Sequence, residues 1–255
     1  MRLSILPSPC LWLTLVLALL GPACSGNVQS VRPEPPPWED DERLAVGFVL
    51  VEGVYNSEVF APWDIFHHTV FHTTTKLDPP QAGMRVFSVA PSLEPLRTFE
   101  DVWLLPDYTF ENAPPIDVLV VPSAEHSMDS DLENEALMDF VRERGSAADW
   151  IVSLCDGAFV LAGAGLLDGR HATTFPSDIE ALRRMFPEVR VHDEHLVVRD
   201  GHALTSAGGA RSYDPALWLV EHLYGREVAL GCAGGMVIDW DPESIGLGDY
   251  SAEGD

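Results

Sequence analysis

Short runs rich in apolar residues occur at four places in the chain, at residues 44–51, 84–90, 117–122 and 149–154, and the first of them is continuous. Each run is shorter than a typical helix, which predicts a β-strand, and the strands at 44–51 and 117–122 are expected to be buried. Strands of this kind lie in the interior of parallel sheets. The four runs therefore predict a parallel sheet at the centre of the fold.

Between and after these strands, apolar residues recur with the spacing of a helix. Helices are expected at residues 57–71, 130–146, 155–167, 177–186 and about 212–224. The helix at 130–146 begins with acidic residues and ends with basic ones, which suits the helix dipole. Its predicted apolar face consists of Leu132, Ala136, Leu137, Phe140 and Val141.

The remaining segments have weaker patterns. Residues 102–105 and 108–110 are expected to form a hairpin, residues 172–174 a short strand, and residues 195–206 a strand pair with Asp200-Gly201 as its turn. The acidic residues 241–255 are expected to be frayed. The alternation of strands and helices predicts a doubly wound α/β fold: a mostly parallel sheet with helices on both faces, as in flavodoxin-like three-layer sandwiches.

The N-terminal residues have the pattern of a signal sequence. Arg2 precedes an apolar run at 11–20, and the small residues Gly21 and Ala23 follow. This run is shorter than the ~20 residues of a membrane span, although a span over residues 3–20 remains an alternative. Ala23-Cys24-Ser25-Gly26 resembles a bacterial lipoprotein box, with Gly21 where Leu is usual.

These features predict the domain organisation and the location of the protein. We expect a signal peptide at residues 1–23, a proline-rich acidic linker at 24–43, one α/β domain at 44–240 and an acidic tail at 241–255. The protein would then be exported to the periplasm or cell envelope, either after ordinary cleavage or with a lipid anchor at Cys24.

Charge and cysteine content narrow the range of partners. The chain has 15 basic and 40 acidic side chains and a formal net charge of −25, which disfavours nucleic acid and anionic membrane surfaces as partners. No CxxC pair or zinc spacing is present. Two of the four cysteines, Cys155 and Cys232, fall in the α/β domain, where a disulfide between them is one alternative in an exported protein.

The segment IVSLCDGAFVLAGAGLL predicts a nucleophile elbow at Cys155, in which a strand runs through a sharp turn into a helix. Gly157 and Ala158 would let that helix pack closely behind the turn. A thiol at a helix N-terminus is expected to have a lowered pKa. Cys155 is accordingly expected to be alkylated or oxidised more readily than Cys232. The alternative is an inert buried cysteine.

A longer stretch of sequence resembles a known family. VSLCDGAFVLAGAGLLDGRHATTFP, with LVVPSA upstream and LTSAGGARSYDPALWLVEHLYG downstream, is similar to the ThiJ/PfpI superfamily of glutamine amidotransferase-like domains. Isonitrile hydratases and the ligand-side domains of AraC-type regulators are the most similar members in character. The resemblance covers residues 44 to about 239. It implies a carboxylate partner for the cysteine, and the segment SEVFAPWDIF places Glu58 at that position.

The resemblance also implies a pocket around the thiol. If Glu58 is protonated it could donate to the thiolate, and if ionised it could act as a base; the alternative is a carboxylate that only favours the helix dipole. An oxyanion hole would use the backbone N–H groups of Ser123, Ala124 and Asp156. Gly208 would border the pocket.

The sequence departs from the family pattern in three ways. Ser123-Ala124 replaces Gly-Gly, Phe175 replaces a histidine, and Asp156 replaces Thr or Ala next to the cysteine, where its charge disfavours a thiolate. With the histidine missing, His126 is a possible pocket residue that could reach the thiol, although its position just past the VPSA loop favours a solvated loop residue.

Two functions compete on this evidence. The first is an enzyme that uses Cys155 and Glu58 for nucleophilic or redox chemistry on a small molecule, with isonitrile hydration as the family activity that best tolerates the missing histidine. The second is a small-molecule binding or sensing module without catalysis. We expect no cofactor and no metal, because His68 and His72 lack a third ligand. A homodimer is a further expectation.

Overall fold

A computed structural model describes residue 38 and residues 42–251. By its internal contacts the chain divides into two units, Met1–Glu34 and Pro35–Asp255, and every described residue belongs to the second. The expected signal peptide, Cys24 and most of the expected linker lie outside the described residues, as do residues 252–255. None of the described helices has the length and apolar character that crossing a membrane would require.

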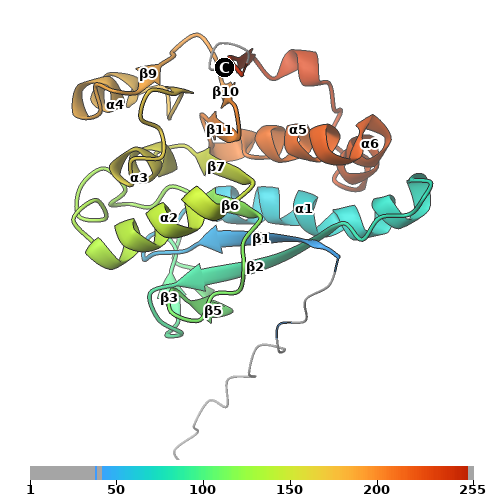
Figure 1. The fold of residues 1–255 in the computed structure, drawn as a ribbon, viewed down its shortest axis with the longest axis horizontal. Helices are drawn as coiled ribbons and strands as arrows, with labels where there is room; N and C mark the ends of the chain where they lie inside the picture. Colours follow the sequence, from blue (N-terminus) through green and yellow to red (C-terminus); the bar gives the residue numbers. More distant parts are fainter. Residues whose placement is uncertain (1–37, 39–41, 252–255) are drawn as a thin grey trace, which may run out of the picture. The chain divides into compact units, whose positions relative to one another are not determined.

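An eight-stranded sheet forms the centre of the domain (Figure 1), in the order β12-β10-β11-β7-β6-β1-β2-β5. Neighbouring strands are parallel except for the antiparallel pair β10 and β11. The strands are β1 (Leu44–Val49), β2 (Met84–Ala90), β5 (Tyr108–Thr109), β6 (Val118–Val121), β7 (Trp150–Leu154), β10 (Val197–Asp200), β11 (Ala203–Ser206) and β12 (Leu247–Asp249). The predicted mostly parallel α/β fold is confirmed.

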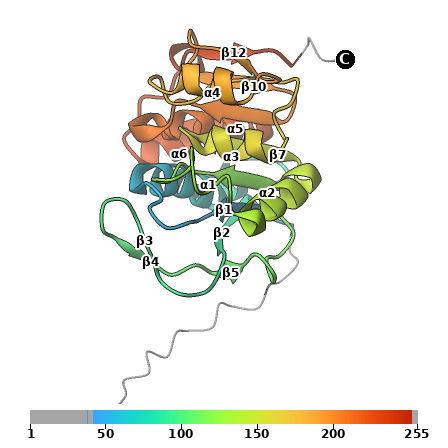
Figure 2. The same ribbon diagram turned by 90° about the vertical axis from the view of Figure 1, so that its left-hand side faces the viewer.

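Helices cover both faces of this sheet (Figures 1 and 2). On one face, α1 (Asn56–Lys76), α5 (Tyr213–Tyr224) and α6 (Arg226–Gly235) pack against one another. On the other lie α2 (Glu135–Ala147) and α3 (Gly157–Gly163). Because successive side chains of a strand point to opposite faces, Val46 and Phe48 join the core under α1, while Ala45 and Val49 join the second core. Both faces of β1 are thus buried, as its apolar run predicts.

A smaller layer follows α3. It contains β8 (His171–Ala172), α4 (Ile179–Met185) and β9 (Arg190–Val191), with β8 and β9 paired in parallel. β8 starts one residue before the segment predicted at 172–174 and shares only Ala172 with it, and the helix predicted at 177–186 is shorter at both ends.

Helix α2 starts later than its sequence pattern predicts. The side chain of Asn134 caps the helix by accepting a hydrogen bond from Leu137 N at 3.2 Å, so that Leu132 precedes the helix. Ala136, expected on the buried face, is exposed, and Met138 is buried in its place. Leu137, Phe140 and Val141 are buried as predicted, so most of the expected apolar face is retained.

The predicted hairpin between residues 102–105 and 108–110 is wrong. The first of these segments forms β4 (Trp103–Leu104), which pairs with β3 (Leu96–Arg97), whereas β5 joins the main sheet beside β2. Asp107 explains the separation, because its carboxylate accepts hydrogen bonds from Ser88 N at 2.9 Å and Ser88 Oγ at 2.8 Å. These bonds tie the segment after β4 to the edge of β2.

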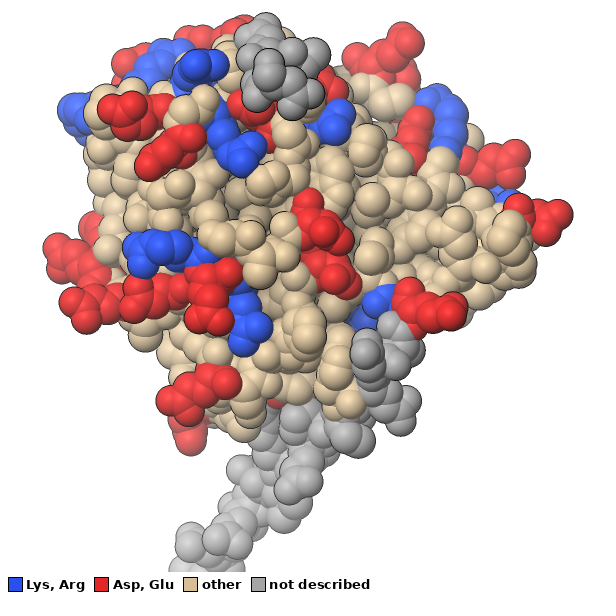
Figure 3. Space-filling view, in the orientation of Figure 1, with Lys and Arg blue, Asp and Glu red and all other residues tan. Residues whose placement is uncertain are grey.

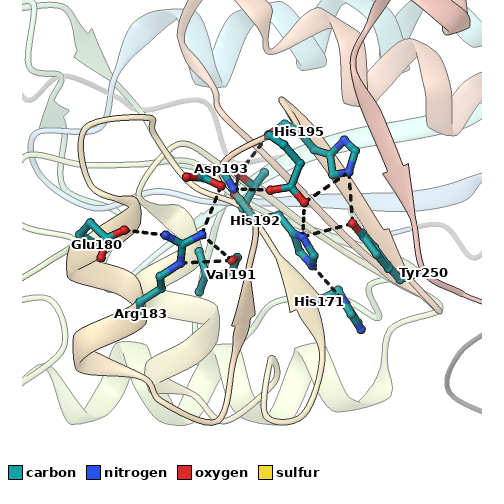
Figure 4. A network of polar contacts seen from close by, with 10 residues as sticks. His171, Glu180, Arg183, Val191, His192, Asp193, His195 and Tyr250 are labelled. Atoms are coloured by element: carbon teal, nitrogen blue, oxygen red, sulfur yellow. Dashed lines mark hydrogen bonds and ion pairs between the residues drawn. The ribbon is translucent and has the colours of Figure 1, made fainter.

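The expectation of frayed residues at 241–255 is wrong for the segment that the structure describes up to Ser251. A 3₁₀ turn at Pro242–Ser244 leads to the buried Ile245 and then to β12, which adds a parallel edge strand to β10. The ring of Tyr250 then stacks on His171, with centroids 4.1 Å apart, and on His192 at 4.4 Å (Figure 4). Apolar and aromatic side chains thus anchor a segment whose acidic composition suggests disorder.

Candidate active site

Cys155 occupies the sharp turn between β7 and α3, the elbow that the sequence predicts. Its backbone has a φ of +52°, a left-handed conformation that non-glycine residues rarely adopt outside strained turns. The turn is held by a hydrogen bond from Cys155 N to Ser206 O at 2.9 Å. Gly157 is required behind it, because a Cβ there would lie 2.0 Å from Val121 O.

A cavity of about 300 Å³ opens above the thiol. It is lined by Tyr55, Ser57, Glu58, Cys155, Asp156, Phe175, Asp178 and Gly209. These residues come from the first turn of α1 and its approach, the elbow, the segment before α4, and the loop after β11. The carboxyl ends of the central strands therefore carry the site, as is usual in open α/β sheets.

Glu58 is held in the cavity by backbone N–H groups from two distant loops. Its carboxylate accepts hydrogen bonds from Ser123 N at 2.8 Å and Gly209 N at 3.1 Å, and it is also hydrogen-bonded to the Cys155 thiol. The side chain is only 2 % exposed. Burial raises the pKa of Glu58 to about 7, although the hydrogen bonds oppose the shift. At neutral pH this carboxyl is therefore poised to accept or release a proton.

The pKa of the Cys155 thiol is raised, which contradicts the lowering expected at a helix N-terminus. Burial is the main cause, followed by the nearby carboxylates of Glu58 and Asp156, while the hydrogen bond from Asp156 N lowers the pKa. Helix α3 has only seven residues, so its dipole is small. The thiol remains protonated next to an ionised Glu58, and its S–H donates to that carboxylate.

Both described cysteines are free, which excludes the alternative of a disulfide between Cys155 and Cys232. Cys232 lies in α6 and is fully buried, and burial raises its pKa to about 12. Cys155 is 7 % exposed and faces the cavity. The two thiols thus differ in access to a ligand, whereas the pKa of both is raised.

Asp156 is a second carboxyl beside the thiol. The hydroxyl of Thr174 donates to its Oδ1 at 2.9 Å, and the backbone N–H of Phe175 also donates to the carboxyl. Burial raises the pKa of Asp156 to about 6, and the neighbouring carboxyl of Asp178 adds to the increase. Asp156 is half-buried, in contrast to Glu58.

The predicted oxyanion hole is not formed as expected. The N–H of Ser123 donates to Glu58, and that of Ala124 donates to Ser127 Oγ at 2.8 Å. Both groups are therefore occupied by the protein itself, and the N–H of Asp156 is directed to the Cys155 sulfur. Of the three expected donors, the N–H of Ser123 is the one that Glu58 occupies.

His126 does not lie at the thiol. Its Nδ1 is 3.2 Å from Asp129 Oδ1, about half of its side chain is exposed, and it is not among the residues that line the cavity. His126 therefore occupies the solvated loop position that the sequence favours, and the alternative of a place in the pocket beside Cys155 is wrong. Phe175, which stands where the family resemblance implies a histidine, lines the cavity and is 41 % exposed.

Gly208 lies against the elbow as expected for a pocket-border residue. Its φ is +72° and its ψ −150°, and a Cβ at this position would be 2.4 Å from the Cys155 Cβ and 2.5 Å from the Cys155 N. Only glycine allows this close approach. The position of the thiol therefore depends on the loop after β11.

Tyr55 and Asp178 line the cavity but were not singled out in the sequence. Tyr55 directly precedes α1 and its ring packs against Phe99 at 4.7 Å, whereas Asp178 directly precedes α4. The signal for Tyr55 is its position three residues before Glu58. Asp178 carries no comparable signal, because its approach to Asp156 depends on how the chain returns after β8.

The absence of a metal site stays a prediction. Among the described residues, no group of three or more His, Cys, Asp or Glu side chains is placed to hold a metal ion. The ring of His72 packs against Gly231 of α6, and His68 lies near Gly235. Burial lowers the pKa of His72.

The sequence of this chain is similar to those of known proteins. The model of the DJ-1/PfpI family matches residues 45–222. Isonitrile hydratase of Pseudomonas putida is 31% identical over 186 residues, covering 73% of this chain and 75% of that protein. Protein dj-1beta of Drosophila melanogaster is 29% identical over 150 residues, covering 58% and 79%.

Solved structures agree with the fold. A ThiJ/PfpI family protein from Pseudomonas syringae superimposes with a TM-score of 0.67 at 26% identity, covering 86% of this chain and 85% of that one. Drosophila melanogaster DJ-1beta gives a TM-score of 0.64 at 22% identity, covering 78% and 100%.

Proposed function

Because the chain belongs to the DJ-1/PfpI family, we propose that it is a cysteine-dependent hydratase of a small molecule, with Cys155 as nucleophile and Glu58 as its proton acceptor. The substrate class that we propose is an isonitrile or a similar small electrophile with an unsaturated carbon. The relative that is 31% identical is an isonitrile hydratase, and the further support comes from the cavity.

The observation that carries this proposal is the hydrogen bond between the Cys155 thiol and the Glu58 carboxyl at the base of a cavity. A neutral thiol is a weak nucleophile unless a base removes its proton during attack. Glu58, with its pKa raised to about 7, matches the requirement for a base that works near neutral pH. The bonds from Ser123 N and Gly209 N hold it in place for this transfer.

The proposed first half of the reaction needs only these two side chains. As sulfur attacks the terminal carbon of the isonitrile, the S–H proton moves to Glu58 and a C–S bond forms. Glu58 then transfers the same proton to that carbon. The product is a thioimidate on Cys155, with the nitrogen doubly bonded to the former isonitrile carbon, and Glu58 is again a carboxylate.

Water completes the reaction. It adds to the thioimidate carbon, one of its protons passes to nitrogen and the other to sulfur, and the C–S bond breaks. The products are an N-substituted formamide and the free thiol, so the sum is one isonitrile and one water giving one formamide. A cavity of about 300 Å³ is at the small end of ligand sites, which fits a small substrate.

A binding or sensing module is the second candidate, and two observations favour it. Both carboxylates raise the pKa of the thiol, and the amides of Ser123 and Ala124 are not available to an oxyanion. In that case the cavity would bind a small molecule without turnover.

The test is hydration of n-butyl isonitrile, followed by the appearance of N-butylformamide. We expect turnover by the unmodified protein, loss in Cys155→Ala, and retention in the matched control Cys232→Ala, which removes the other described thiol. The rate should rise as pH increases through about 7, because Glu58 acts as a base only when ionised, and Glu58→Gln should abolish this rise. Saturable binding with no formamide at any pH would refute the hydratase and support the binding module.

We further propose export and, through Cys24, a lipid anchor, on the strength of the signal-like pattern of residues 1–23 and the box at 23–26. Radiolabelled palmitate incorporation on expression in a bacterial host, lost in Cys24→Ala, would support the anchor. The domain boundaries at residues 24, 44 and 240 likewise stay predictions, to be tested by limited proteolysis.

Surface character supports the remaining proposals on partners. Figure 3 shows acidic and basic side chains interspersed on one face without a large continuous basic area, in keeping with a protein that does not bind nucleic acid. Exposed apolar side chains lie on α1 and around β4, where a second copy could pack in a homodimer. They are Phe60, Phe99, Val102, Trp103 and Leu105. Light scattering of the protein and of Trp103→Glu would test the dimer.

A further inference from the structure

Two carboxyl groups flank the Cys155 thiol, and they differ in their access to water. Glu58 is 2 % exposed and both of its oxygens accept backbone N–H groups, at 2.8 Å and 3.1 Å. Asp156 lines the same cavity but is half-buried. A base that activates water must be reached by water, and of these two groups Asp156 meets that requirement better.

The contacts of Asp156 suit a group that gains and loses a proton. Thr174 Oγ1 lies 2.9 Å from Asp156 Oδ1 and 3.0 Å from Cys155 O. When Asp156 is ionised, the single hydroxyl proton of Thr174 can be donated to it. When Asp156 is protonated, Asp156 can donate to Thr174 while Thr174 donates to the Cys155 carbonyl. Both protonation states therefore have a hydrogen-bond partner without a change of geometry.

The charged surroundings of Asp156 are all acidic. Asp178 faces it from the segment before α4, Glu58 faces the cavity from α1, and the phenol of Tyr55 and the Cys155 thiol complete the titratable groups that line the cavity. No Lys, Arg or His is among the lining residues that the structure describes. Burial, together with the neighbouring carboxyl of Asp178, keeps the basicity of Asp156 above that of an ordinary aspartate, which helps it to accept a proton from water.

We infer that Asp156 is the general base for the second half of the reaction, in which water hydrolyses the Cys155 adduct. This inference rests on the proposed hydratase function. Asp156 takes a proton from the water as its oxygen bonds to the thioimidate carbon, and delivers it to the substrate nitrogen. It then carries the second proton from the new hydroxyl to sulfur as the C–S bond breaks. Glu58 is thus the base for addition of the thiol, and Asp156 is the base for addition of water.

The two halves can be separated by mass spectrometry of the intact protein after mixing with n-butyl isonitrile. We expect Asp156→Asn to form the adduct on Cys155 but to hydrolyse it at least about 10²-fold more slowly, so that a species heavier by one isonitrile molecule accumulates. Glu58→Gln should not form the adduct. Asp139→Asn, which removes an exposed carboxylate on α2, is the matched control and should behave as the unmodified protein.

A pH series gives a readout that a purely structural role would not change. Hydrolysis of the adduct in the unmodified protein should accelerate as pH rises through about 6, where Asp156 ionises. Asp156→Asn should lose this acceleration, and Asp156→Ala serves as a second variant if the first is misfolded by circular dichroism. Unchanged hydrolysis in a folded variant overturns the role of Asp156 alone, whereas absence of both adduct and formamide in the unmodified protein overturns the hydratase proposal as well.

Discussion

Substituting Gly208 by alanine should destabilise the domain through two separate effects. The first is backbone strain, because a φ of +72° with a ψ of −150° is accessible essentially only to glycine, and such strain costs about 1–3 kcal/mol. The second is overlap of the new Cβ with Cys155, whose Cβ, N and Cα would be 2.4, 2.5 and 2.8 Å away. Overpacking of this kind costs about 1–3 kcal/mol more, so Gly208→Ala should lose roughly 2–6 kcal/mol.

Gly225→Ala isolates the first effect. Gly225 has a φ of 87° and a ψ of 166°, and a Cβ there would meet nothing within 4 Å. It should therefore lose only the backbone part, about 1–3 kcal/mol. Urea unfolding followed by tryptophan fluorescence compares the two variants, and a difference of ~2 kcal/mol corresponds to a shift of roughly 1 M in midpoint. Equal midpoints would refute the claim that the loop after β11 presses on the elbow.

Two further predictions concern other parts of the domain. Burial raises the pKa of Glu58 from 4.5 to about 7, so between these pH values the folded state binds more protons than the unfolded one. The free energy of unfolding should therefore fall as pH rises through this range, by roughly 3 kcal/mol in all. Glu58→Gln should remove this part of the pH dependence of the urea midpoint, and an unchanged pH dependence would contradict the raised pKa. Tyr250→Ala removes the stacking on His171 and His192, which should lower the stability by about 2 kcal/mol and speed hydrogen exchange in β12. Substitution of an exposed residue, Trp103→Ala, should leave that exchange unchanged. If exchange in β12 of Tyr250→Ala stays slow, the stack does not anchor the strand.

Features that depend on neighbours in sequence could be predicted. The apolar run of β7, the small residues after Cys155 and the alternation of strands and helices are local patterns, and they predicted the elbow and the fold. The family resemblance added Glu58, which lies 97 positions before the cysteine and has no local pattern connecting it to the thiol. For the elbow, which is encoded in one strand and the helix that follows it, the sequence was sufficient.

Features that depend on contacts between distant segments could not be predicted from the sequence. The N–H of Ser123 was expected to face a substrate, but it donates to a carboxylate 65 positions away in the sequence. The pKa of Cys155 was expected to fall, and it rises because burial and two carboxylates outweigh one short helix. β12 was missed because its pairing with β10 and the stack around Tyr250 are invisible to composition.

The order of strands in the sheet has a consequence for synthesis of the protein. The strands β6, β1, β2 and β5 form one side of the sheet and are complete once Val121 has left the ribosome, whereas β7, β11, β10 and β12 form the other side and come later. Helix α1 belongs to the early half, but its partners α5 and α6 end only at Tyr224 and Gly235.

At about 5–20 residues per second, the 103 residues from Val121 to Tyr224 take roughly 5–20 s to translate. During that interval the part of α1 that packs against α5 and α6 has no cover from those helices. The nascent chain therefore exposes an apolar helix face for several seconds before the cavity at Cys155 is assembled. This is the period in which binding by a chaperone would do most to prevent aggregation.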